Sequence, residues 1–186
     1  MDDSADPSGP DPDLEHIGAD LPRVARRAIA RYLSQSPAEA EPVDAALPRL
    51  PVFVTLRERG GSLRGCVGSL SPIEPDVVRE TARSAVLAAT RDPRFPPVSG
   101  GELESLRIEV SVLLPDEAVQ GLEDLDPSRY GVIVRDVSGR RGLLLPAVPG
   151  VRDARSQVAV ARRKAGIPES ASVELRRFEV LKFSDA

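Results

Sequence analysis

The sequence predicts an α+β fold of two β-β-α-β units with mixed sheets, preceded by one helix. The prediction rests first on the element order, since strand, strand, helix and strand follow one another twice along the chain. Aligning the two halves also places Arg64-Gly65 on Arg141-Gly142, together with the starts of the two helices. Both observations favour an internal duplication. The 186 residues, 41% of them hydrophobic, suffice for one compact domain of about 150 residues plus a tail.

An acidic segment opens the chain and is predicted to be a disordered tail. Residues 1–19 are rich in Asp, Pro, Gly and Ser, so little apolar burial offsets the entropy of ordering them. The folded domain is therefore expected to span residues 20–186. Its first helix begins at Asp20, has Pro22 in the first turn and ends near Ser34, because apolar residues recur between these positions at helical spacing.

A hairpin, a helix and a strand follow. Residues 52–57 and 62–70 are predicted strands on either side of a Gly-rich turn. Pro75 opens a helix that ends before Asp92-Pro93, and alternating apolar residues predict a strand over 107–114. The expected apolar face of the helix holds Val78, Ala82, Ala85, Val86 and Ala89.

The second unit repeats this order. Strands are predicted over 130–136 and 141–148 around a short turn, and a helix over 153–165 that Gly166 closes. One final strand is expected over 173–183.

Composition excludes several classes of protein. No apolar run approaches the roughly 20 residues that cross a bilayer, and no signal peptide is recognisable, so we expect a cytoplasmic protein with no membrane contact. A net charge of −4 and 3% aromatic residues argue against nucleic acid as a partner. Cys66 and His16 are the only residues of their types, which excludes an intramolecular disulfide and a Cys/His metal site. No nucleotide-binding fingerprint occurs, so neither a metal nor a cofactor is expected.

Five ordered motifs carry a family resemblance. They are FVTLRERGGSLRGCVGSL at 53–70, DPRFPP at 92–97, ELESLRIEVSVL at 102–113, RRGLLLPAV at 140–148 and KAGI at 164–167. In order and spacing, residues 20 to 184 resemble the AMMECR domain family, also called AmmeMemoRadiSam system protein A.

The resemblance implies an α+β fold with two unequal subdomains and a cleft near the LRGCVG hairpin. It also implies a Memo-type protein and a radical SAM protein as partners, whereas it implies no particular reaction. Two positions depart from the family pattern, because Ala147 stands where Gln is usual and Arg163 where Cys is usual. Functional roles that the family assigns to residues of the second half are therefore less directly implied for this chain.

Cys66 is the candidate nucleophile in the hairpin. Alternate residues of a strand share a face, so Arg64 is expected beside the sulfur, where its charge would favour the thiolate. Gly65 and Gly68 leave the backbone bare, so a ligand could approach and an anion could meet N–H groups. The alternative interpretation is a packed structural cysteine between glycines that allow close packing.

Four more residues are candidates for the same site. Glu109 points away from the apolar face of its strand, where it could pair with Arg64 as a general base or as a structural ion pair. Asp92 and Arg94 lie in the proline-rigid DPRFPP loop, which can position binding groups. The alternative is that Asp92 caps a turn and Arg94 forms a salt bridge. Arg141 is the counterpart of Arg64 in the second half.

Two functions remain open at this point. In the first, a small anionic ligand binds in a cleft at the hairpin and the protein acts as an enzyme through Cys66 or a carboxylate. A Cys-His dyad is excluded because the folded part holds no histidine. In the second, the protein is a non-catalytic adaptor that presents the hairpin to the Memo-type or radical SAM partner.

Overall fold

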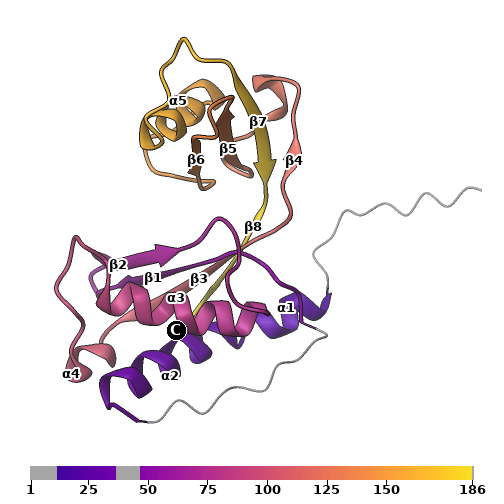
Figure 1. Ribbon diagram of the computed structural model, residues 1–186. Coiled ribbons are helices and arrows are strands. Elements are labelled where there is room, and N and C mark those ends of the chain that lie inside the picture. Colours follow the sequence, from indigo (N-terminus) through magenta and orange to yellow (C-terminus); the bar gives the residue numbers. More distant parts are fainter. Residues whose placement is uncertain (1–11, 37–46, 186) are drawn as a thin grey trace, which may run out of the picture. The chain divides into compact units, whose positions relative to one another are not determined.

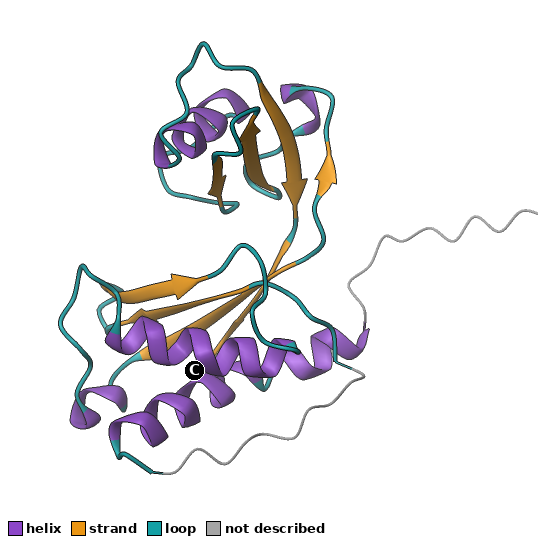
Figure 2. Cartoon of the chain, viewed as in Figure 1, coloured by secondary structure: helices purple, strands orange, loops and turns teal. Residues whose placement is uncertain are grey.

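The computed structural model describes residues 12–36 and 47–185 of the chain. These residues form two compact units. Of the described residues, 12–36, 47–111 and 182–185 belong to the first unit, and Val112–Leu181 form the second. Each unit combines a four-stranded sheet with helices (Figures 1 and 2). None of the helices in the described ranges is long and apolar enough to span a membrane.

The sheet of the first unit has the strand order β2-β1-β3-β8. Its strands are β1 (Val52–Arg57), β2 (Leu63–Gly68), β3 (Arg107–Leu113) and β8 (Val180–Ser184). The helices of this unit are α1 (Pro12–Gly18), α2 (Leu21–Leu33), α3 (Val77–Thr90) and the short α4 (Gly100–Leu103). Because β2 is an edge strand, one row of its backbone groups has no strand partner.

Helix α3 packs on β1 and β2 and lies beside α2 (Figure 1). Asp76 caps it by accepting a hydrogen bond from the backbone N–H of Arg79 at 2.8 Å. A Cβ atom on Gly65 would lie 2.3 Å from the carbonyl oxygen of Ala88. The glycine therefore lets α3 approach β2 more closely than any other residue would allow.

The second unit has the sheet order β4-β7-β5-β6, with every pair antiparallel. Its elements are β4 (Glu117–Ala118), η1 (Leu122–Asp124), β5 (Gly131–Asp136), β6 (Arg141–Leu144), α5 (Ala154–Lys164) and β7 (Val173–Phe178). The core of this unit lies between α5 and the sheet and includes Val132, Val134, Leu144, Val158 and Ala161.

The two units share one topology, which confirms the predicted repeat of β-β-α-β. The strand order β2-β1-β3 of the first unit corresponds to β6-β5-β7 of the second. The Arg-Gly dipeptides occupy equivalent places, because a Cβ on Gly142 would lie 2.1 Å from the carbonyl oxygen of Ala161 on α5. In both units a glycine of the hairpin thus allows close packing of the following helix.

The structure corrects the predicted N-terminal tail and the predicted final strand. Residues Pro12–Gly18 form α1, and Leu14 is buried there, so the disordered tail does not extend to residue 19; residues 1–11 lie outside the described part. The strand expected over 173–183 is two strands, β7 and β8, which belong to different sheets. Apolar and polar residues continue across Glu179, so the pattern gives no sign of the change of sheet.

Three smaller predictions also change. Mixed pairing was expected, but the second sheet is antiparallel throughout. Strands β2 and β6, the second strands of the two hairpins, are shorter than predicted. The loop predicted between Ser36 and Pro51 falls mainly on residues outside the described part. The buried face of α3 is rotated from the expected one, because α3 packs on both the sheet and α2. Its buried residues include Val77, Glu80, Thr81, Ser84, Ala85, Ala88 and Ala89.

Candidate functional site

Asp92 links the DPRFPP loop to the edge strand β2. Its side chain is only 3% exposed, and Oδ2 accepts a hydrogen bond from the backbone N–H of Cys66 at 2.8 Å. That N–H belongs to an edge strand and would otherwise lack a protein acceptor. The bond therefore satisfies the strand edge and fixes the loop beside Cys66.

The same carboxylate holds Arg94 through two side-chain hydrogen bonds. Arg94 Nε donates to Asp92 Oδ1 at 2.9 Å, and Nη2 donates to Oδ2 at 2.7 Å. This fork geometry is the strongest that arginine forms with a carboxylate. The hydrogen bond from Arg94 holds the pKa of Asp92 well below its usual range despite the burial of Asp92, and the bond from Asp92 raises the pKa of Arg94.

Arg94 is nevertheless open to solvent on its outer side. Its side chain is 54% exposed, and its Nη1 donates no hydrogen bond to any residue in the described part of the chain. A guanidinium held rigidly by one edge and free at the other is a suitable donor for an anionic ligand.

The Cys66 thiol lies within the same cluster. Cys66 is half-buried, and Thr55 of β1 faces it directly in register. The Thr55 hydroxyl lies 3.4 Å from Sγ and can donate to it. Arg94 Nη2 lies 3.5 Å from the carbonyl oxygen of Cys66. The cation beside Cys66 is thus Arg94.

Arg64 has a different task from the one expected. It is 8% exposed, forms a two-pronged ion pair with Glu102, and donates from Nη1 to the carbonyl oxygen of Pro96 at 2.9 Å. This pair lowers the pKa of Glu102. The centroid of the Phe95 ring lies 6.0 Å from the guanidinium carbon of Arg64 and 5.5 Å from that of Arg94. Arg64 therefore fastens the far end of the DPRFPP loop.

The expected pair between Arg64 and Glu109 does not form. Strand β1 lies between β2 and β3, so residues of the outer two strands are separated by two strand spacings, about 9.6 Å. The true partner, Glu102, closes the capping box of α4 with Ser99. The Ser-x-x-Glu spacing at 99–102 was a sequence signal for that helix start that our sequence interpretation missed.

The two glycines of the hairpin serve packing. Ala88 occupies the space above Gly65, and a Cβ on Gly68 would lie 2.4 Å from both the Phe53 ring and the carbonyl oxygen of Val52. The space on the Cβ side of each glycine is therefore filled by neighbouring atoms.

Two further residues lie away from this cluster. Arg141 belongs to β6 of the second unit, opposite Arg135, and its Nε is buried without a hydrogen-bond partner among the described residues. His16 is exposed in the last turn of α1. The structure thus brings Cys66, Asp92 and Arg94 together, adds Thr55, and uses Arg64 as a support.

Fold and site together define an α+β protein of two related sheet-and-helix units, with a polar cluster at the edge strand of the first. The chain belongs to the AMMECR1 family, whose sequence model matches residues 22–183. It is 46% identical over 165 residues to a protein of Thermotoga maritima, covering 86% of this chain and 94% of that one. It is 38% identical to a protein of Methanopyrus kandleri, covering 90% and 88%.

A solved structure shares the fold. The crystal structure of an uncharacterized protein from Pyrococcus horikoshii superposes with a TM-score of 0.79 at 34% sequence identity, covering 91% of this chain and 92% of that one. These comparisons confirm the family resemblance and the α+β fold.

Proposed function

We propose that the first unit binds a small anionic ligand at a site built from Arg94, Asp92, Thr55 and Cys66, with Cys66 placed to act as a nucleophile. The observation that carries the proposal is the double role of Asp92. It binds the Cys66 N–H and the Arg94 guanidinium at once, so the cation and the thiol keep a fixed relation to each other.

The second unit supports this proposal as an internal comparison. Its Arg-Gly dipeptide is followed by Leu143, which is 8% exposed, where the first unit has Cys66. The segment after α5 reads Gly166-Ile167-Pro168, where the segment after α3 carries Asp92 and Arg94. The shared topology therefore forms without this polar cluster. Residues that a fold does not require are candidates for function.

The electrostatics decide which group could act as a base. Asp92 is held deprotonated by Arg94 and already accepts hydrogen bonds with both oxygens, so it is a poor proton acceptor. Its role is to position Arg94. Cys66 and Thr55 are the nucleophilic side chains of this site, and thiolates react readily where a cation is close.

Protection of Cys66 from alkylation tests the binding site. The protein is labelled with neutral iodoacetamide in the presence of inorganic phosphate, sulfate or a short dicarboxylate, and Cys66, the sole cysteine, reports the rate. At least one of these anions should slow labelling of the native protein in a saturable way. Arg94→Gln should remove the protection, whereas Arg91→Gln, which changes an exposed neighbouring cation, should keep it.

Two results would reject the proposal. One is native Cys66 that labels readily while no anion protects it. The other is equal protection in the wild type and in Arg94→Gln, because the anion would then act elsewhere. Thermal unfolding of each variant checks that the fold is intact.

A further inference from the structure

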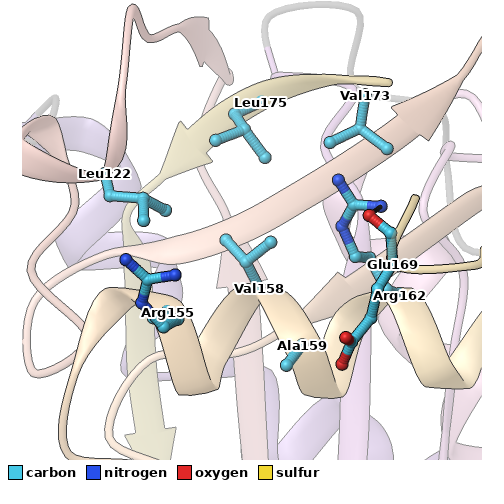
Figure 3. A pocket seen from close by; sticks show the side chains of 8 residues that line it. All are labelled: Leu122, Arg155, Val158, Ala159, Arg162, Glu169, Val173 and Leu175. Atoms are coloured by element: carbon cyan, nitrogen blue, oxygen red, sulfur yellow. Dashed lines mark hydrogen bonds between the residues drawn. The ribbon is translucent and has the colours of Figure 1, made fainter. Parts of the chain in front are cut away.

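A groove opens between α5, β7 and η1 in the second unit (Figure 3). Its volume is about 430 Å³, within the range of sites that hold ligand or partner side chains. The floor is apolar, and arginines stand near its two ends in Figure 3. The lining residues are Leu122, Arg155, Val158, Ala159, Arg162, Glu169, Val173 and Leu175.

The groove exists because α5 covers only part of the sheet. Helix α5 packs on β6 and β5, and Gly142 lets it lie very close to β6. Across the sheet, Gly142 faces Val134, and Val134 faces Leu175 of β7. Leu175 and Val173 therefore continue the apolar face beyond the helix, and both remain half-exposed at the border of the core.

The first unit shows how the equivalent surface is normally covered. Strand β3, the counterpart of β7, has Ile108, Val110 and Val112 all at 0% exposure. Beside α3, the first unit has the additional helices α1 and α2. A Cβ on Gly18 at the end of α1 would lie 2.0 Å from the Phe183 ring of β8, and Arg26 of α2 binds Asp185 directly after β8.

The second unit has no counterpart of α1 and α2. Within Val112–Leu181, all of which the structure describes, α5 and the three-residue η1 are the only helices. The groove thus occupies the place where the related unit carries helices.

Two cationic side chains and one acidic side chain line the groove, namely Arg155, Arg162 and Glu169, so its net charge favours an acidic partner. Helix α5 carries four cationic side chains, Arg155, Arg162, Arg163 and Lys164, and no acidic one. Arg162 is engaged with the carbonyl oxygens of Pro168 and Ala171. Arg155 is exposed near the Asp153 carboxylate, with which it interacts electrostatically, and its guanidinium donates no hydrogen bond to another residue in the described ranges. A carboxylate on the incoming partner would accept hydrogen bonds from the Arg155 guanidinium.

We propose that this groove docks an acidic amphipathic helix of a partner protein. Apolar residues spaced i, i+3 or i+4, and i+7 would fill the trough formed by Val158, Val173 and Leu175, as in other helix-in-groove complexes. Acidic residues flanking that stripe would meet Arg155. The docked helix would thereby supply the layer that α1 and α2 supply in the first unit.

A designed peptide tests the chemistry with the full-length protein. The probe is a fluorescent helical peptide of Leu and Glu, with Leu at i, i+3, i+4 and i+7, and its control is a peptide of the same composition with the Leu positions scrambled. Fluorescence anisotropy should show binding of the amphipathic peptide alone. Leu175→Ser and Arg155→Glu should each weaken it by about tenfold or more, as for central interface residues.

Matched variants separate this site from general effects. Val137→Ser removes an apolar side chain that is 97% exposed in a turn of the same unit, and Arg163→Glu reverses a charge of α5 outside the groove. Both should leave affinity within about twofold, as expected away from interface centres. The proposal is overturned if the scrambled peptide binds equally or if Arg163→Glu weakens binding as much as Arg155→Glu. It is also overturned if submicellar decanoate displaces the peptide, because the groove would then bind a small amphiphile.

Discussion

Asp92 Oδ2 lies 2.8 Å from the backbone nitrogen of Cys66, so a loop carboxylate completes the hydrogen bonding of the edge strand at the position of the thiol. The same group orients Arg94. Arg64, 8% exposed, fastens the loop from the other side through the Pro96 carbonyl. The loop thus places the Arg94 cation beside Cys66, and residues of β2 hold the loop at both ends.

Acid should weaken the wild type more than a variant that lacks the Asp92 charge. The hydrogen bond from Arg94 lowers the pKa of Asp92 in the folded protein, so Asp92 stabilises the fold above its unfolded pKa of about 3.9 and loses this contribution as the pH falls below that value. Asp92→Asn should lower the free energy of unfolding at pH 7 by about 2 kcal/mol, the usual value for charged hydrogen bonds.

Urea unfolding of both proteins from pH 7 down to pH 3 measures this difference. It should be constant above about pH 5 and shrink below about pH 4. A difference that does not change with pH would show that the Asp92 charge is unimportant for stability.

Removal of Arg64 should destabilise the first unit. Arg64→Ala leaves Glu102 without its partner and frees the Pro96 carbonyl, and breaking such a largely buried pair costs about 2–4 kcal/mol. Arg57→Ala on the neighbouring strand is the control, because Arg57 is exposed and its loss should cost no more than about 0.5 kcal/mol. Equal losses of unfolding free energy in the two variants would contradict the role assigned to Arg64.

Gly65 and Gly142, the glycines at equivalent places in the hairpins of the two units, should be equally intolerant of a methyl group. Gly65→Ala and Gly142→Ala each place a Cβ against a helix carbonyl oxygen, at 2.3 and 2.1 Å, so each should cost about 2–3 kcal/mol or prevent folding. In Gly101→Ala the new methyl meets no atom within 4 Å, and helix propensity predicts unchanged or slightly higher stability. The melting temperatures of the three variants, each compared with the wild type, test this prediction. An unchanged melting temperature in Gly142→Ala would argue against equivalent roles of the two glycines.

Local patterns predicted most of the elements but not their long-range pairing. The helix expected from Asp20 to Ser34 is α2, Leu21–Leu33, and the strand expected over 52–57 is β1. Hydrophobic periodicity and caps are local, so the sequence displays them directly. The division of residues 173–183 between β7 and β8 depends on which sheet each half joins, and no local pattern encodes that choice.

The candidate site was also predicted only in part, because its residues can be read from local sequence but their contacts depend on long-range pairing. The sequence indicated Cys66, Asp92 and Arg94 separately, because a lone thiol and a proline-rigid loop are visible in the residues. The hydrogen bond from Cys66 to Asp92 needs the edge position of β2. The ion pair of Arg64 with Glu102 likewise needs the turn that brings α4 to the hairpin. The sequence alone suggested Glu109 as the partner of Arg64.

The most direct test of the central claim is the preference of Cys66 for an anionic over a neutral alkylating reagent. Rates with iodoacetate and iodoacetamide are measured on the native protein and divided by the rates of a free thiol, with Cys66→Ser as the blank. Arg94 should make the corrected ratio favour iodoacetate by about tenfold, the factor that ~1.4 kcal/mol of charge interaction gives. Arg94→Gln should abolish this preference and Arg91→Gln should retain it. Labelling only after denaturation, or the same ratio in wild type and Arg94→Gln, would contradict an anion site formed by Arg94 at Cys66.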